Sequence, residues 1–140
     1  MKKLLAIVVL GLLINGNAYT KIIELKKCST SNQPFNPKNY INVGFKIDTN
    51  KSILQRVRIM TDSYYEDQKK EFMKEFGNTI GLEKFSIWDF NIEYFDDRFV
   101  KAKRKYSGND MEATWEIDLK NKTALFKRMA KSSGTLWKCK

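Results

Sequence analysis

The sequence predicts a mainly β fold of the α+β class, an antiparallel meander of about eight strands with one packed α-helix at about residues 63–76. We expect the sheet to be barrel-like or strongly curved. Apolar and polar residues alternate along most of the chain, which is typical of strands with one buried face. Short runs rich in Asn, Asp, Ser and Gly join these segments, so consecutive segments are expected to pair as antiparallel neighbours.

A hairpin pattern occurs twice in the chain. The segment from Phe45 to Ser52 reads aromatic, charged, Ile, Asp and then Asn-Lys-Ser. The segment from Trp115 to Thr123 repeats this order with a turn one residue longer. Asn is typical of tight hairpin turns because it tolerates left-handed backbone angles. We therefore expect two β-hairpins of the same kind, with Asn50 and Asn121 providing the turn conformation.

The same alternation predicts the strands along the whole chain. A loop containing Pro34 and Pro37 follows the first of them. Trp88, Trp115 and Trp137 lie on expected strands and are predicted core residues. The expected strands cover residues 22–27, 41–47, 53–60, 88–94, 98–106, 111–119, 123–130 and 135–140. The clearest inward face is formed by Met111, Ala113, Trp115, Ile117 and Leu119.

One segment has the period of an amphipathic helix instead. Ser63 and Glu66 have the spacing of a capping box, in which each side chain bonds a backbone amide near the other. Gly77 is a natural end for the helix. The polar face mixes acidic and basic side chains, which does not suit a membrane-surface helix, so we expect the apolar stripe to pack on the sheet. That stripe consists of Tyr65, Phe72, Met73 and Phe76.

The first twenty residues predict a signal peptide. Two lysines precede an apolar run of eleven residues, Leu4 to Ile14, which is shorter than the ~20 residues of a membrane-spanning helix. The segment from Ala18 to Thr20 resembles the small-x-small site of a signal peptidase. We therefore expect residues 1–20 to be removed, and residues 21–140 to form a single exported domain, periplasmic or secreted.

The only two cysteines, Cys28 and Cys139, stand near opposite ends of this domain. An even pair in an exported chain predicts a disulfide, and no close motif indicates a redox role. The bond would close a loop of about 110 residues and stabilise the fold by about 4–5 kcal/mol in the chain-entropy model. It would also bring the first and last strands together, closing or nearly closing a small barrel. An open, strongly curved sheet is the alternative.

The chain is strongly basic, with a formal net charge of +10. Residues 1–20 contain two lysines and no acid, so the exported domain keeps a charge of +8. Such a charge attracts anionic surfaces and acidic proteins, although a bias in the coding DNA would produce the same composition. The densest basic stretch is the strand over 98–106. Its five basic residues form the predicted binding face: Arg98, Lys101, Lys103, Arg104 and Lys105.

The residues that most enzymes use are scarce. The chain has no histidine, which excludes Ser-His-Asp and Cys-His mechanisms and most zinc sites. A two-carboxylate hydrolase remains conceivable, but lysines on the neighbouring strands favour cross-strand charge pairs instead. We therefore predict no catalytic residue, no cofactor and no metal. The acids concerned are Asp89, Glu93, Glu112, Glu116 and Asp118.

These observations predict a non-enzymatic binding protein. The leading hypothesis is a module whose basic face meets an anionic envelope component or an acidic protein partner. A carrier of a small apolar ligand in the β-barrel is the alternative, and the two-carboxylate hydrolase is the third. Nucleic acid is not an expected partner, because an exported protein seldom meets it. No integral membrane span is expected in the mature chain.

Overall fold

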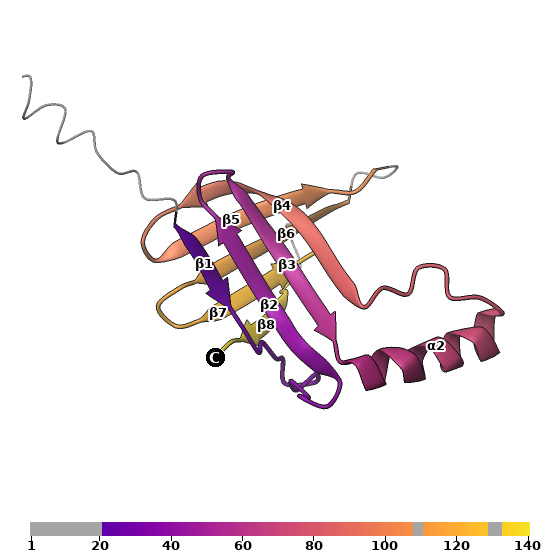
Figure 1. Ribbon diagram of the computed structural model, residues 1–140. Helices are drawn as coiled ribbons and strands as arrows, with labels where there is room; N and C mark the ends of the chain where they lie inside the picture. The colour runs from indigo at the N-terminus through magenta and orange to yellow at the C-terminus, as the bar shows by residue number, and fades with distance from the viewer. Residues whose placement is uncertain (1–20, 108–110, 129–132) are drawn as a thin grey trace, which may run out of the picture.

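The computed structural model describes residues 21–107, 111–128 and 133–140. Within them, eight strands form one antiparallel sheet in which each strand pairs with its neighbours in sequence (Figure 1). One helix lies between the third and fourth strands. The predicted meander of eight strands and one helix is therefore confirmed. The elements are β1 (Ile22–Leu25), β2 (Tyr40–Asp48), β3 (Ile53–Met60), α2 (Asp62–Phe76), β4 (Phe85–Phe95), β5 (Phe99–Lys105), β6 (Glu112–Asp118), β7 (Thr123–Lys127) and β8 (Thr135–Lys138).

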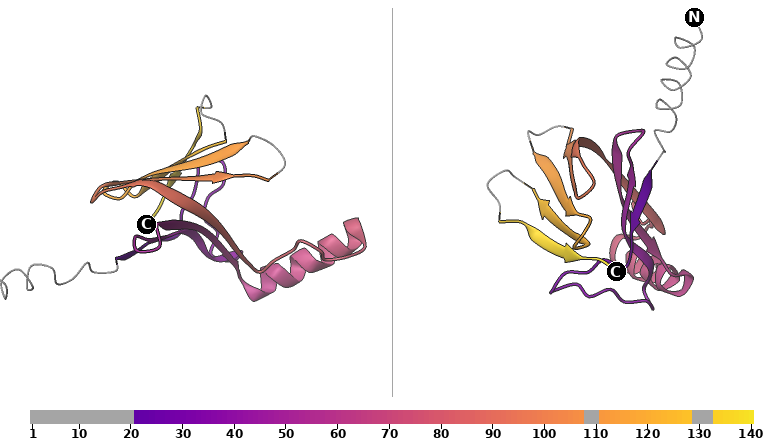
Figure 2. Two further views of the ribbon diagram at one scale, coloured as in Figure 1. Left: turned by 90° about the horizontal axis from the view of Figure 1, so that it is seen from above. Right: turned by 90° about the vertical axis from the view of Figure 1, so that its left-hand side faces the viewer.

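The sheet curls into a half-barrel (Figure 2). Its edge strands, β1 and β8, approach each other just after β1. There Ser29 and Lys138 exchange two backbone hydrogen bonds of 2.9 and 2.8 Å. The disulfide between Cys28 and Cys139 lies at the same point and links positions 111 residues apart. The predicted disulfide and the predicted approach of the first and last strands are confirmed.

Both copies of the repeated pattern form hairpins, and their turns are equal in length. β2 ends at Asp48 and β6 ends at Asp118, and in each case the next strand begins five residues later. One carboxylate oxygen of Asp48 accepts hydrogen bonds from the backbone amides two and three residues ahead, at 3.1 Å each. Asp118 does the same at 3.0 Å each. In both hairpins the Asp side chain therefore starts the turn.

The left-handed residue of each turn is not the predicted one. Ser52 and Lys122 have φ of 52°, and they stand four residues after the turn-starting Asp in their hairpins. Asn50 and Asn121 do not have positive φ, so the prediction that they provide the turn conformation is wrong. Asn50 stands two residues after the turn-starting Asp of its hairpin, whereas Asn121 stands three residues after its own. When the two turns are aligned on the Asp, the Asn-Lys pairs therefore occupy different positions.

The concave side of the half-barrel carries the core. The predicted inward face of β6 is confirmed for Ala113, Trp115 and Ile117, which are buried, whereas Met111 precedes the strand and is exposed. Trp88 and Trp137 are partly buried and pack against the core. The largest fully buried side chains come from five different segments and include Phe45, Ile47, Leu54, Val100, Ile117 and Cys28.

The helix lies where the sequence predicts it, but its surroundings differ from the prediction. Thr61, rather than Ser63, caps its start by accepting a hydrogen bond of 3.3 Å from the Tyr64 amide. Gly77 ends it in the left-handed conformation, as predicted. No residue of α2 is buried. The helix projects from the end of the sheet (Figure 1) and contacts the sheet strands through its first turn, where the Tyr64 ring meets Tyr40.

The expected packing of the apolar stripe on the sheet is therefore not found in the described chain. The stripe is open because the chain leaves β3 in a direction that carries α2 beyond the ends of the strands (Figure 2). Across the described ranges, no helix has both the length and the apolar character needed to cross a bilayer.

Candidate functional site

Strand β3 directs two arginines toward the concave side. Leu54 and Met60 occupy one face of this strand, and both are buried. Because side chains alternate along a strand, Arg56 and Arg58, which lie between them at two-residue steps, point to the same side. In register, Arg56 lies opposite aromatic residues on both neighbouring strands. The curl of the sheet thus brings two cations toward the core.

Three aromatic rings surround the Arg56 guanidinium. Its central carbon lies 4.7 Å from the ring centroid of Trp137, 5.3 Å from that of Phe45 and 5.9 Å from that of Trp115. One Nη atom also donates to two backbone carbonyls, at 2.9 and 3.3 Å. Cation–π contacts and carbonyl acceptors offset part of the desolvation of a buried guanidinium. The rings come from β2, β6 and β8, so only the folded sheet assembles them.

Arg56 and Arg58 have no acidic partner in the described part of the chain. Among the described residues no carboxylate forms an ion pair with Arg56 or Arg58. The Nε of Arg58 is buried without a hydrogen-bond partner, and the guanidinium carbon lies 5.5 Å from the Trp88 ring centroid. Burial, and then the charge of Arg58, lower the pKa of Arg56 to about 10. Arg56 therefore remains protonated at neutral pH, and its charge is uncompensated.

A small pocket of about 110 Å³ lies beside the two guanidinium groups. Its other walls include the proline loop at residues 33–35, Tyr40 of β2 and Trp137 of β8. The disulfide helps to build it, because Cys28 lines the pocket and its partner cysteine follows Trp137 by two residues. The volume is well below the ~300–1,000 Å³ of pockets that enclose a whole drug-sized ligand. It suits one small chemical group of a larger molecule.

A tyrosine pair connects the pocket to the helix. The Tyr40 and Tyr64 rings meet edge to face, with centroids 5.4 Å apart. Burial raises the pKa of Tyr64, and its hydrogen bond with Tyr40 raises it further. Tyr64 therefore keeps its phenolic proton at neutral pH. Tyr40 lines the pocket, so the pocket offers one tyrosine hydroxyl group in addition to the two guanidinium groups.

The predicted basic face is divided between the two sides of the sheet. Lys101, Lys103 and Lys105 lie on the outer side of β5. Arg104 lies on the opposite side, in register with a buried alanine of β6, and its guanidinium stacks on the neighbouring tyrosine ring at 5.5 Å. Arg98 forms a 3.4 Å ion pair with the Asp of the β6–β7 turn. The structure therefore does not bring these five residues together on one surface.

Acidic side chains accompany the outer lysines. Lys103 Nζ lies 2.6 Å from Glu112 and 3.9 Å from Glu93, and Lys105 Nζ lies 3.6 Å from Glu112. The hydrogen bond from Lys103 lowers the pKa of Glu112 and raises the pKa of Lys103. A general acid requires a raised carboxyl pKa, so Glu112 has the opposite tuning. This surface is a cross-strand network of charge pairs.

The sequence does contain a signal for the arginine pair. Only five of the 26 basic residues are Arg, and two of these five share one face of β3 with Leu54 and Met60. That signal is incomplete, because the other face of β3 also carries apolar residues, such as Val57 and Ile59. The periodicity alone cannot say which face is buried.

The described residues contain no group of three or more His, Cys, Asp or Glu side chains arranged to hold a metal ion. Comparisons of the chain with family models, with curated proteins and with solved structures found no match.

Proposed function

We propose that the protein binds the anionic group of a small molecule, a carboxylate or a phosphate, in the pocket beside Arg56 and Arg58. The observation that carries this proposal is the pair of partly buried guanidinium groups without any acidic partner among the described residues. Buried charges in proteins are normally paired, and perturbed ionisable groups cluster at functional sites. A bound anion would supply the missing partner.

The chemistry of the pocket supports this class of ligand. Guanidinium groups bind carboxylates and phosphates through paired, charge-assisted hydrogen bonds. Arg58 lines the pocket, and its Nε has no hydrogen-bond partner among the described residues. The aromatic walls suit an apolar or aromatic body attached to the anion. The pocket volume of about 110 Å³ suits the anionic group alone, so the rest of the ligand would extend past Tyr40 and the proline loop.

The proposed ligand is still anionic, as the basic charge of the chain predicts. The proposed binding site, however, is the pocket beside Arg56 and Arg58 instead of the basic strand β5. Two of the outer lysines of β5, Lys103 and Lys105, are engaged by acidic side chains of β4 and β6. Arg56 and Arg58, in contrast, form no ion pair with any acid in the described part of the chain. The apolar walls of the pocket also suit the apolar part of a ligand, which is the kind of ligand that the carrier hypothesis predicts. The proposed role is binding, without a chemical step.

The proposal also includes export. A lysine-led apolar segment of signal-peptide type at residues 1–20 supports it. The disulfide between Cys28 and Cys139 supports it too, since such bonds persist in oxidising compartments. Outside the cytoplasm the ligand would be an envelope component or a molecule from the surroundings.

The experiment is a titration of the purified protein with three probes, followed by tryptophan fluorescence and calorimetry. Benzoate and phenyl phosphate carry an anion on an aromatic body, and benzyl alcohol is the neutral control. We expect the two anions to bind and to quench fluorescence, because Trp137 lines the pocket. In Arg58→Gln the affinity should fall about tenfold or more, since a hydrogen bond to a charged group contributes ~1.5–3 kcal/mol.

The matched control is Arg98→Gln, which removes a half-exposed guanidinium that does not line the pocket. It should leave probe binding unchanged. Equal binding of benzyl alcohol and benzoate would contradict the proposal. So would an Arg58→Gln protein that binds benzoate as tightly as the parent.

A further inference from the structure

The helix α2 and the segment that returns to β4 form an arm, residues 62–84, with an unusually open apolar surface. No residue of α2 is buried. The exposed fractions of the side chains are 52% for Met73, 57% for Phe76 and 84% for Ile80. The Phe72 and Phe76 rings pack at a tilt with centroids 5.2 Å apart, and with Ile80 they line a shallow hollow. An isolated helix of 15 residues is marginally stable in water, so this arm gains from a cover.

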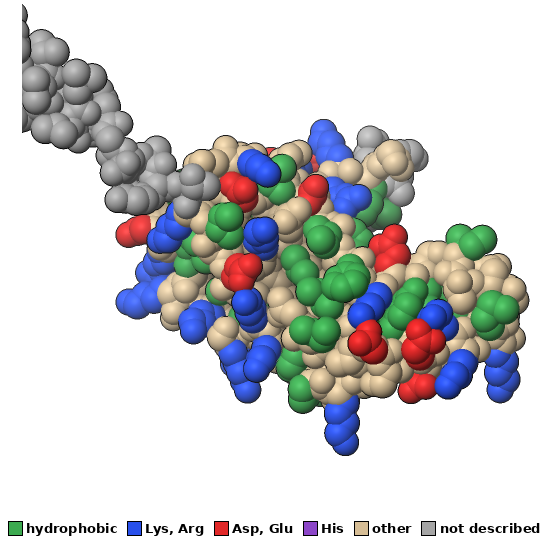
Figure 3. Space-filling view, in the orientation of Figure 1, with side chains coloured by type: hydrophobic (Ala, Val, Ile, Leu, Met, Phe, Trp, Pro, Cys, Tyr) green, Lys and Arg blue, Asp and Glu red, His purple; other side chains and the backbone are tan. Residues whose placement is uncertain are grey.

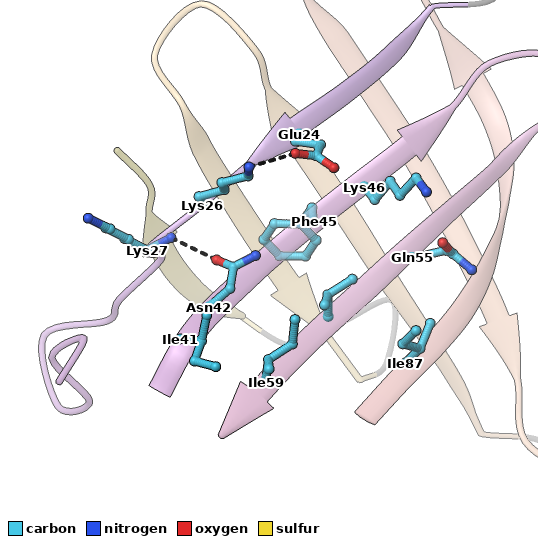
Figure 4. Close-up of a pocket in the computed structure, with 11 residues that line it drawn as sticks. Glu24, Lys26, Lys27, Ile41, Asn42, Phe45, Lys46, Gln55, Ile59 and Ile87 are labelled. Carbon is cyan, nitrogen blue, oxygen red and sulfur yellow. Dashed lines mark hydrogen bonds and ion pairs between the residues drawn. The ribbon is translucent and has the colours of Figure 1, made fainter. Parts of the chain in front are cut away.

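A second open apolar surface lies on the outer side of β2, β3 and β4. It is an outer groove of about 410 Å³ (Figure 4). Its apolar lining includes Ile41, Val57, Ile59 and Ile87, and the side chains of Ile41 and Ile87 are 58% and 57% exposed. Ile41 is exposed beside the bulge in the β2–β3 pairing between Tyr40 and Asn42. Monomeric proteins rarely leave such patches uncovered unless something binds them.

Both the sheet and the arm expose hydrophobic side chains on one side of the molecule. Figure 3 shows hydrophobic side chains in one view over both the sheet and the arm. The outer groove lies at the end of the sheet where β3 leads into the arm and β4 returns from it. A molecule approaching from this side would therefore meet the groove and the arm together.

The charges of the two surfaces are complementary. Helix α2 contains five acids and three lysines, which gives a net charge of −2 in a chain of net charge +10. The outer groove contains one acid, Glu24, and three lysines, which gives +2. Lys26 pairs with Glu24, so Lys27 and Lys46 supply the excess charge. An acidic apolar helix and a basic apolar groove on one chain fit each other in a second copy.

We propose that two copies of this chain form a symmetric dimer in which the arm of each copy lies in the outer groove of the other. A two-fold axis makes this arrangement self-complementary, because each copy contributes one arm and one groove. Both apolar surfaces become covered at once, and each acidic helix meets basic residues. A membrane surface has no basic groove to match the acidic helix. The mixture of acids and lysines on α2 also differs from the basic polar face that is typical of membrane-binding helices. This inference does not depend on the anion pocket.

Sedimentation velocity of the purified full chain tests the proposal over about 1–100 µM, a range in which moderate dimers dissociate. We expect twice the chain mass at the upper end. Phe76→Asp on the arm and Ile87→Asp in the groove should each weaken the dimer by tenfold or more. The control is Leu136→Asp, which changes a 50% exposed side chain on β8, outside both surfaces. Circular dichroism checks that each variant folds.

A mixture of the two interface variants gives the sharper result. In each variant alone, both contacts of the dimer are damaged. In the mixture, the intact arm of Ile87→Asp meets the intact groove of Phe76→Asp, so dimer should partly return. A monomer throughout the range, a dimer that both substitutions leave intact, or no recovery in the mixture would overturn the proposal. Cosedimentation of a monomer with vesicles of anionic lipid would overturn it in favour of a membrane partner.

Discussion

At Arg56, the proposed binding function and the stability of the fold make opposite demands on one residue. Its guanidinium contacts three aromatic rings and two backbone carbonyls, yet burial and the neighbouring Arg58 lower its pKa from the ordinary arginine value to about 10. The native state therefore releases this proton more readily than the unfolded chain. The group opposes folding at every pH at which it is charged in both states. This penalty is relieved only as the pH rises above about 10, toward the higher pKa of the unfolded chain.

We expect Arg56→Met to keep or raise the free energy of unfolding at neutral pH, while binding of benzoate is lost. Replacing a buried charge by an apolar side chain of similar length is often neutral or stabilising. Chemical denaturation at pH 7 measures the first effect and calorimetry the second. Arg98→Met is the control, because its guanidinium is half exposed and should change neither quantity much. If the free energy of unfolding falls by about 2 kcal/mol or more in Arg56→Met, the cation–π contacts of Arg56 stabilise the fold, and the prediction is wrong.

At the scale of elements, the hairpins depend on their turn-starting aspartates. Asp118 accepts two backbone hydrogen bonds in the β6–β7 turn and a third, of 2.8 Å, from the Asn121 side chain. The backbone hydrogen bond from Asn121 is the main cause that lowers the pKa of Asp118, and Arg98 lowers it further. Because the folded pKa is lowered, the stabilisation is present above the ordinary pKa of 3.8. It is lost as the pH falls through the folded value.

Asp118→Ala should therefore lower the midpoint of urea unfolding at pH 7, because the turn amides lose their acceptor. Asp97→Ala, in the β4–β5 turn, is the matched control and should leave the midpoint nearly unchanged. The difference between Asp118→Ala and the parent should shrink in acid, where Asp118 becomes protonated. Equal midpoints for the two variants at pH 7 would show that the turn does not need the carboxylate.

At the scale of the whole molecule, the disulfide joins the two edges of the sheet. Cys28 follows β1 and Cys139 follows β8, so the bond ties the ends of a meander whose strands otherwise pair only with their neighbours in the described ranges. The disulfide also holds Trp137 of β8 against the guanidinium of Arg56. The stability of the fold and the shape of the proposed anion pocket are therefore coupled through one covalent bond.

The intact mass of the protein recovered from its host should correspond to a chain that begins near Lys21 and has lost two hydrogens. The double variant Cys28→Ser, Cys139→Ser should unfold about 4 kcal/mol more easily in the chain-entropy model. It should also bind benzoate more weakly, because Trp137 is released. A full-length chain with both thiols reduced would contradict the proposed export. Unchanged stability in the double variant would contradict the role given to the bond.

Much of the fold follows from local patterns. Local alternation and turn residues predict the strands, the position of α2 and its end at Gly77, because these signals act between residues close in sequence. The disulfide is predictable from the count of two cysteines in an exported chain, which requires no knowledge of the fold. The turn assignment fails at Asn50 and Asn121. Aligning the copies on Asn-Lys hides the equal spacing from Asp48 and Asp118, which the hydrogen bonds of the turns follow.

The sequence by itself determined the order of elements, the antiparallel meander and the link between the chain ends. Only the tertiary structure decided which face of β3 is concave, because Leu54 and Met60 on one face and Val57 and Ile59 on the other make both faces apolar. It likewise decided that α2 projects away from the sheet. These outcomes depend on the curl of eight strands and on the direction in which the chain leaves β3. The hydrophobic periodicity of a single segment cannot predict this long-range geometry, because the curl arises only when the strands assemble into a sheet.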